Sequence, residues 1–187
     1  SMDVYDEALV GHSREEAIDR TVKLIASIAY KHRSNQESGG WGISPDKTTR
    51  GASDQTALDA NVCGTAAWLM WEYLPDEYRE YARRMVEYEA NSLIDYEVPY
   101  YQSPDGTILT PGNTRGEENA WNSGVLALAL SMMPNHQNRE AWAEKCTELM
   151  LSSYATPNDL LNTHEIDGKA VKDWLNGSNA ENNGIAI

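Results

Sequence analysis

The segment from Arg115 to Asn122 holds the densest group of side chains in this chain that could do chemistry. It reads Arg-Gly-Glu-Glu-Asn-Ala-Trp-Asn and stands directly before a strictly apolar run. Acidic and amide side chains at the start of a helix satisfy its free backbone amides. Helix capping is therefore the plain interpretation of Glu117 and Glu118, and it leaves the rest of the segment to be explained.

Asn119, Trp121 and Asn122 follow in the first turns of the same predicted helix, and capping does not account for them. A buried amide without a hydrogen-bond partner costs about 1–3 kcal/mol. We therefore expect these side chains to face a cavity that holds water or a ligand, where the helix begins.

The run from Asn119 to Ala129, Asn-Ala-Trp-Asn-Ser-Gly-Val-Leu-Ala-Leu-Ala, resembles a family motif. It is similar to the Asn-x-Trp helix opening, followed by small residues, of α/α-toroid polysaccharide lyases of the heparinase and alginate-lyase type. Asn182-Asn183-Gly184 resembles part of the Asn-Asn-His-Gly signature of such toroids, although Gly184 stands where the signature carries His. The resemblance covers the predicted helices and these motifs, not the whole chain.

This resemblance implies β-elimination on a polysaccharide that contains uronate. Removing the proton beside a uronate carboxylate requires that the carboxylate is neutralised and that a Tyr or His side chain takes the proton. An Arg would hold the anionic sugar, and aromatic rings would bind the substrate by stacking. The residues in these roles would be Asn119, Asn122 or Asn183 as the neutralising amide, Tyr100, Tyr101 or His164 as the base, Arg115 on the anion, and Trp41, Tyr100 and Trp121 against the sugar.

Hydrolysis by two carboxylates is the rival enzymatic interpretation. It needs an acid and a base or nucleophile about 5–10 Å apart. Asp54 or Asp59 from one predicted helix start, with Glu117 or Glu118 from another, would supply the pair.

A non-catalytic binding module is the third interpretation, because helical-repeat surfaces bind glycans or peptides without chemistry and the fold alone does not specify function. The chain has 6 Trp and 10 Tyr but no Phe. These side chains suit half-exposed surfaces that stack on sugar rings, and they also serve as ordinary core residues. The Gly-Gly-Trp-Gly loop also resembles terpenoid-cyclase toroids, whose aspartate-rich signatures the chain lacks.

The sequence predicts no cofactor and no catalytic metal. The 4 His residues show no metal-ligand spacing, although the acidic loop from Asp105 to Glu118 has the residue types that bind calcium. Cys63 and Cys146 each lie in an apolar run, far from any Cys-x-x-Cys pattern, so we expect buried free thiols.

The charge of the chain limits its partners. The 15 Lys and Arg residues stand against 29 Asp and Glu residues, a net charge of −14. This balance argues against nucleic acid and anionic membranes, which require clustered basic residues. The sequence also contains no 18-residue apolar stretch. The expected partner is an oligo- or polysaccharide. Lys47, Arg50 and Arg115 would form a local basic group that binds acidic sugars of this partner. A polysaccharide partner favours a secreted or cell-envelope bacterial protein.

Helical patterns must position these side chains. Apolar periodicity and the stops at Pro75 and Pro134 predict small, apolar, buried helices before each proline and amphipathic helices after it. A capping box at Ser13 and Glu16 marks an earlier helix. The predicted helices span about 13–33, 53–74, 76–94, 117–133 and 138–154, and the segment 156–187 is rich in loops.

The two prolines are in equivalent places of a predicted repeat. Arg79-Glu80 and Arg139-Glu140 also occupy equivalent positions in the two copies of the repeat, and so do Asp59 and Glu118. Short turns force the helices of a pair to be antiparallel, with the buried members inside. The predicted fold is therefore all-α: repeated antiparallel helix pairs forming a partial α/α toroid, as a single domain over residues 3–187.

Five or six helices cannot close a twelve-helix ring. We therefore expect an open arc, one subunit of an oligomer, or part of a larger protein whose remainder completes the ring. In each case the long loops would lie at the end where the buried helices begin, and that end is the expected place for the site.

Overall fold

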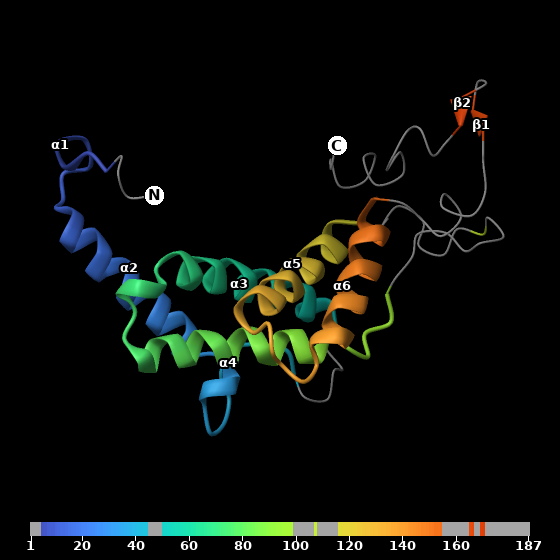
Figure 1. The fold of residues 1–187 in the computed structure, drawn as a ribbon, viewed down its shortest axis with the longest axis horizontal. Helices are drawn as coiled ribbons and strands as arrows, with labels where there is room; N and C mark the ends of the chain where they lie inside the picture. The colour runs from blue at the N-terminus through green and yellow to red at the C-terminus, as the bar shows by residue number, and fades with distance from the viewer. Residues whose placement is uncertain are drawn as a thin grey trace.

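The computed structural model describes residues 5–44, 50–98, 107, 116–154, 165–166 and 169–170, and it confirms the all-α class (Figure 1). Two strands of two residues each, β1 (Glu165–Ile166) and β2 (Lys169–Ala170), pair antiparallel. The helices are α1 (Glu7–Val10), α2 (Arg14–Tyr30), α3 (Arg50–Leu69), α4 (Asp76–Ser92), α5 (Gly116–Met132) and α6 (Arg139–Tyr154), with the 3-10 turns η2 (Arg33–Asn35) and η3 (Trp71–Tyr73).

Helices α2 to α6 begin and end within five residues of the predicted ranges, because the local signals for these boundaries are strong. The Ser13 hydroxyl accepts a hydrogen bond from the backbone N–H of Glu16 and caps α2, as predicted. Pro75 stands at the N-cap position of α4. The short helix α1 was not predicted; Asp6 caps it and Gly11 ends it in the left-handed conformation with φ of 79°.

The two helices predicted to be buried, α3 and α5, run parallel to each other. A Cβ on Gly124 would lie 2.7 Å from the side-chain nitrogen of Asn61, and one on Gly64 would lie 2.6 Å from a methyl of Leu128. The two contacts follow in the same order along both helices. The first turns of α3 and α5 therefore lie at the same end of the molecule, as Figure 1 also shows.

Helices α2 and α4 pack against α3, and α6 packs against α5. Helix α2 is antiparallel to α3, since Arg14 contacts Tyr73 and Ile25 contacts Cys63. The start of α6 lies beside the C-terminal part of α4, where Glu87 contacts His136 and the carbonyl of Tyr96 accepts from Lys145, and the two helices cross steeply (Figure 1).

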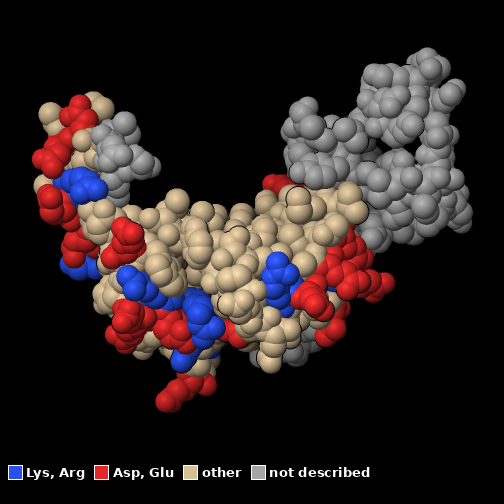
Figure 2. All heavy atoms as spheres, viewed as in Figure 1, with Lys and Arg blue, Asp and Glu red and all other residues tan. Residues whose placement is uncertain are grey.

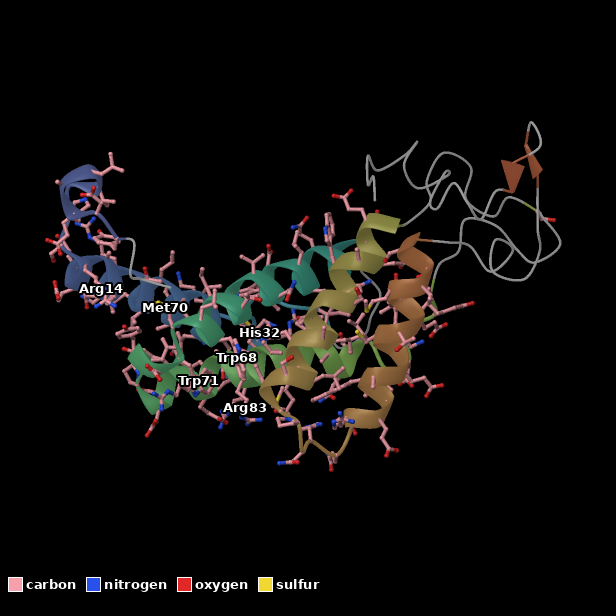
Figure 3. All side chains as sticks on the ribbon, turned by 45° about the horizontal axis from the view of Figure 1, so that its top comes forward. Arg14, His32, Trp68, Met70, Trp71 and Arg83 are labelled. Carbon is pink, nitrogen blue, oxygen red and sulfur yellow. The ribbon has the colours of Figure 1, made fainter. Side chains whose placement is uncertain are left out.

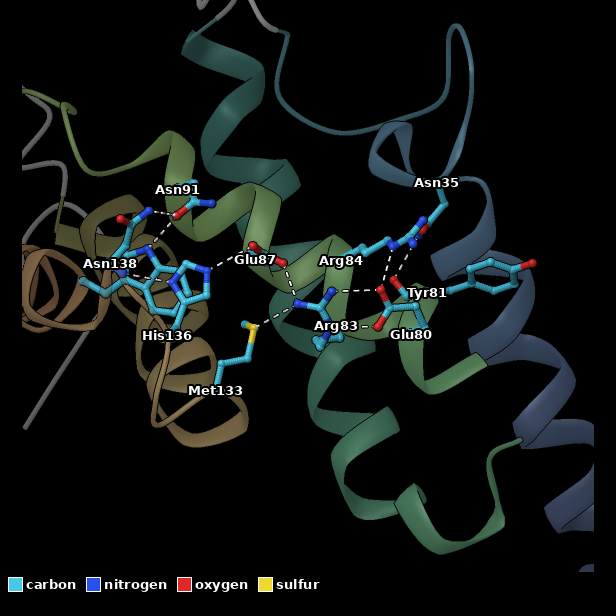
Figure 4. A network of polar contacts seen from close by, with 11 residues as sticks. Asn35, Glu80, Tyr81, Arg83, Arg84, Glu87, Asn91, Met133, His136 and Asn138 are labelled. Carbon is cyan, nitrogen blue, oxygen red and sulfur yellow. Dashed lines mark hydrogen bonds and ion pairs between the residues drawn. The ribbon is translucent and has the colours of Figure 1, made fainter. Parts of the chain in front are cut away.

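Polar side chains connect α4 to the segments on either side of it (Figure 4). The amide of Asn35, in η2, donates to the carbonyl of Tyr81 at 3.0 Å. At the other edge of α4, the amide of Asn138 donates to Asn91 at 2.9 Å. Between them, the hydrogen bond from the Arg83 guanidinium lowers the pKa of the Glu80 carboxyl to about 2. Both neighbours of α4 are thus attached to it by directed hydrogen bonds.

The core lies between α2, α3, α4, α5 and α6. Small residues of α3, including Ala60 and Ala67, let the helices approach closely, and the large indole of Trp142 is completely buried from the α6 side. Cys63 and Cys146 are free and buried, which confirms the prediction. Burial raises the pKa of the Cys63 thiol to about 11.

One face of α3 is uncovered by the described residues, and this corrects the prediction of a helix buried on most sides. The exposed fractions of Val62 and Leu69 are 62% and 77%. Figure 2 shows Lys, Arg, Asp and Glu side chains gathered mainly along the α4 side and the ends of the described part, with a largely uncharged surface between. Among the described residues, none of the helices is both long and apolar enough to cross a membrane.

Candidate functional site

The first turns of α5 carry the predicted chemical residues in two different environments. The side chains of Asn119 and Asn122 are completely buried, whereas Glu118 and Trp121 are half-buried. The Asn119 amide donates to the Ser152 hydroxyl at 2.9 Å, and that hydroxyl donates to the carbonyl of Leu149. Asn119 therefore lies in the contact between α5 and α6, where Ser152 of α6 offsets part of the cost of burying it.

The third and fourth turns of α3 carry two further polar side chains. Asp59 is exposed, and Asn61 is half-buried with its amide against Gly124 of α5. Trp121 is one helical turn before Gly124, so it lies on the side of α5 that faces α3. Sequence reasoning missed Asn61, although an amide in the middle of a small, apolar helix was a usable signal.

Trp41 is fixed within the loop that follows α2. Its indole N–H donates to the carbonyl of Ile28 at 2.9 Å, and its ring meets the ring of His32 edge-on at 4.6 Å. The side chain is half-buried. The indole nitrogen is thus engaged within the protein, and only the partly exposed ring remains for stacking.

A buried His–Glu pair lies behind Trp41 and was not predicted. His32 and Glu89 are 0% and 1% exposed, and the His32 Nε2 to Glu89 Oε1 distance is 3.0 Å. The backbone N–H of Ser34 donates to His32 Nδ1, so this nitrogen is the acceptor and Nε2 carries the hydrogen that Glu89 accepts. The hydrogen-bond network therefore assigns His32 Nε2 as the donor and a Glu89 carboxyl oxygen as the acceptor.

Glu89 connects three segments of the chain. One carboxylate oxygen accepts from the backbone N–H of Ile43 at 2.8 Å, and the other accepts from the Thr56 hydroxyl at 3.0 Å. Ile43 belongs to the loop after α2, Thr56 belongs to the start of α3, and Glu89 belongs to α4. The carboxylate therefore holds the loop against the end of the molecule where α3 begins.

Gly42 gives this loop its close approach to the His–Glu pair. Its φ is 117°, and a Cβ there would lie 2.4 Å from His32 Nε2 and 3.0 Å from Glu89 Oε1. A side chain at this position would both strain the backbone and displace the pair. The Gly-Gly-Trp-Gly motif thus has a structural explanation.

The order Ser34, His32, Glu89 resembles a nucleophilic triad in outline, with the Ser34 hydroxyl 2.8 Å from His32 Nδ1. Two observations favour a structural role instead. Ser34 is only two residues from His32, whose side chain caps η2 through the Ser34 N–H. The imidazole is also fully buried, so it has no room to pass a proton to a substrate.

Several predicted site residues lie outside the described residues. These are Tyr100, Tyr101, Arg115, His164 and Asn183, together with Lys47 and most of the loop from Asp105 to Glu118; for Asp54 and Arg50 only the backbone is described. The structure therefore brings together the α3 and α5 side chains and leaves the proposed bases and the anion-binding Arg as predictions. Within the described ranges, no group of three or more His, Cys, Asp or Glu side chains is arranged to hold a metal ion.

Comparison with known proteins adds no assignment. No protein-family model, no curated protein and no solved structure matches this chain.

We expect the replacement Asn119→Ala to lower the free energy of unfolding by about 1–3 kcal/mol, because it removes a buried amide that joins α5 to α6. Urea denaturation of Asn119→Ala, Ser152→Ala and the double variant would measure this. The coupling energy between the two positions should be about 0.5–1.5 kcal/mol. Strictly additive effects would mean that the bond contributes nothing to stability.

Proposed function

We propose that this chain is a carbohydrate-active protein with the helix arrangement of a partial α/α toroid, and that it cleaves a uronate-containing polysaccharide by β-elimination. The substrate would lie across the end of the molecule where α3 and α5 begin. Two consecutive helix pairs, α3 with α4 and α5 with α6, whose first members run in the same direction, are the order that such toroids repeat, and this supports the proposal.

The observation that carries the proposal is the contact of Asn61 with Gly124. It brings the middle of α3 against the third turn of α5, where Asn61 and Trp121 are half-buried and reach solvent. An amide and an indole at the surface are the two kinds of group that bind a sugar carboxylate and a sugar ring. Asn61 is therefore our candidate for the neutralising amide, and the buried Asn119 acts as a positioning residue for α5.

The reaction would proceed as follows. Hydrogen bonds to the uronate carboxylate make the proton on the adjacent carbon more acidic. A base removes that proton, the electron pair forms a carbon–carbon double bond, and the bond to the leaving sugar oxygen breaks. The oxygen then takes a proton. Tyr100, Tyr101 or His164 remains the candidate base.

Hydrolysis is the second candidate, and the exposure of Asp59 favours it. Asp59 lies in the third turn of α3 and the half-buried Glu118 in the first turn of α5, on two helices that contact each other. Two carboxylates at such a place can serve as acid and base. The two mechanisms give different products, so a single assay separates them.

The test is incubation of the intact chain with polygalacturonate, alginate, hyaluronan and heparan sulfate. We expect ultraviolet absorbance to rise with at least one polymer, because elimination creates a conjugated double bond. Reducing ends without that absorbance would indicate hydrolysis and refute elimination. Binding without either product would indicate a binding module.

For an active polymer, we expect Asn61→Ala to reduce the elimination rate about 10²-fold, the effect of removing one hydrogen-bond donor to a developing anion. Asn138→Ala is the matched control, since it removes an amide at the contact of α4 with α6. The control should keep its rate. Equal rates for the wild type and Asn61→Ala would remove Asn61 from the mechanism.

A further inference from the structure

A pocket of about 370 Å³ lies where α3 ends and η3 begins, and neither the predicted site nor the elimination chemistry uses it. It is lined by Trp68, Leu69, Trp71, Glu72 and Tyr73. Figure 3 labels Trp68 and Trp71 at this end of α3, with Arg14 of α2 nearby. Its volume lies within the range of ordinary small-ligand sites.

The pocket is separate from the α3–α5 site. Trp68 follows Asn61 by two helical turns, about 10 Å along the helix axis. Between them, Gly64 packs directly against Leu128 of α5 and Val86 of α4. A ligand in the pocket would therefore not contact Asn61 through this face.

The aromatic rings of the pocket are unusually accessible. Trp68 is 44% exposed and Tyr73 is 41% exposed. The rings of Trp68 and Trp71 lie 6.2 Å apart at an angle of 48°, so they form two adjoining walls rather than a closed stack. Large apolar surfaces exposed together in this way mark binding sites more often than isolated exposed residues do.

The polar groups around the rings carry both signs of charge. Glu72 supplies a carboxylate to the lining. On the other side, the Arg14 guanidinium donates to the Tyr73 hydroxyl at 3.2 Å, and the Arg79 guanidinium lies 5.6 Å from the centre of the Trp71 ring. A ligand in the pocket would therefore meet hydrogen-bond acceptors and donors beside an aromatic wall.

This combination selects among ligand classes. A quaternary ammonium ion is disfavoured because two guanidinium groups already lie at the rings, one of them over Trp71. An anion is disfavoured because Glu72 lines the pocket. A neutral ring with many hydroxyl groups matches all of these features, since its C–H face stacks on an indole and its hydroxyls bond to groups of either sign.

We propose that this pocket is a second carbohydrate site, which binds one neutral pyranose ring of an oligosaccharide against Trp68. Glu72 accepts hydrogen bonds from the sugar hydroxyls, and Tyr73 and Arg14 bind the opposite edge of the ring. The site needs no catalysis at the α3–α5 end, so it stands whether or not the chain performs elimination.

The test is titration of the intact chain with neutral hexasaccharides of glucose, galactose, mannose and xylose, followed by the indole N–H signals in NMR spectra. Choline and oligogalacturonate serve as the cationic and anionic probes. We expect saturable binding of at least one neutral hexasaccharide, with the largest shift at Trp68 or Trp71. Binding of choline or oligogalacturonate alone, or of none of the probes, would overturn the proposal.

Two matched Trp variants locate the binding. Trp68→Ala should weaken binding at least about tenfold, whereas Trp121→Ala, at the α3–α5 site, should leave it unchanged. Trp68 is half-exposed, so its replacement should leave the fold intact, and the unshifted Trp142 signal would verify this. Loss of binding in Trp121→Ala but not in Trp68→Ala would assign the sugar to the other end and refute the pocket. Elimination assays on the same variants report on the proposed enzyme separately.

Discussion

Replacement of Glu89 by alanine is expected to lower the free energy of unfolding by about 3–5 kcal/mol. This should be the largest effect of any replacement among His32, Ile43, Thr56 and Glu89. The carboxylate is 1% exposed and accepts from His32, from the Ile43 backbone and from Thr56. Alanine would leave all three donors facing an empty, buried volume. Each buried donor without a partner costs about 1–3 kcal/mol, only partly recovered where water enters. Urea denaturation monitored by circular dichroism would measure the loss.

Glu89→Gln is the matched control for this prediction. The glutamine oxygen can still accept from His32 and Ile43, and its amide can donate to the Thr56 hydroxyl. We therefore expect it to retain most of the stability. If Glu89→Ala and Glu89→Gln were equally destabilised, the negative charge and not the number of hydrogen bonds would be the important property. A Glu89→Ala variant as stable as the wild type would contradict the buried cluster altogether.

Replacement of Trp142 by alanine is expected to cost about 3–5 kcal/mol as well, here through a cavity. The indole is completely buried between α6 and α4, it stacks on His136 at 4.2 Å, and its N–H donates to Asn91 at 3.0 Å. Alanine would remove the ring contacts and leave the Asn91 oxygen with one donor fewer. Thermal unfolding followed by calorimetry would show the decrease.

Trp71→Ala provides a comparison for Trp142→Ala, because Trp71 is only half-buried at the edge of the core. The same change of residue type should cost clearly less there, since exposed area contributes little to the transfer free energy. Equal losses at the two positions would argue that Trp142 is not enclosed as the structure has it.

The sequence predicted the helices well because their signals are local. Proline at positions 75 and 134, the Ser13 cap and the apolar periodicity each act within a few residues of the boundary that they set. The same local character explains the missed helix α1, a four-residue element whose cap at Asp6 has no apolar run behind it.

The candidate site was predicted less completely because helical periodicity does not identify the neighbour of a side chain. Asn119 was expected at a cavity, and its amide instead bonds to Ser152, 33 residues further along the chain. The contact of His32 with Glu89 spans 57 residues and involves a carboxylate that looks, in sequence, like any other in an acidic helix. Only the packing of α4 against the loop distinguishes it.

The exposed face of α3 is a further difference between the prediction and the structure. The small, apolar composition of α3 predicted burial on most sides. Among the described residues α3 packs mainly against α2, α4 and α5, and Val62 and Leu69 stay exposed. Composition reports what a helix can bury, and the number of neighbours decides what it does bury. Trp68 was for this reason not predicted as a surface residue.

The docking of the Gly42–Ile43 loop on Glu89 also has a consequence for the order of folding. Helices α5 and α6 meet across a short turn, so closing that pair costs little chain entropy and it can form early. The loop that ends in Gly42 and Ile43 can dock on Glu89 only after α3 and α4 have come together. We therefore infer that the Glu89 contacts form late, after the rate-limiting step of folding. In a chevron experiment, Glu89→Ala would then accelerate unfolding and leave the refolding rate nearly unchanged. Slower refolding of this variant would mean that the Glu89 contacts form before the rate-limiting step.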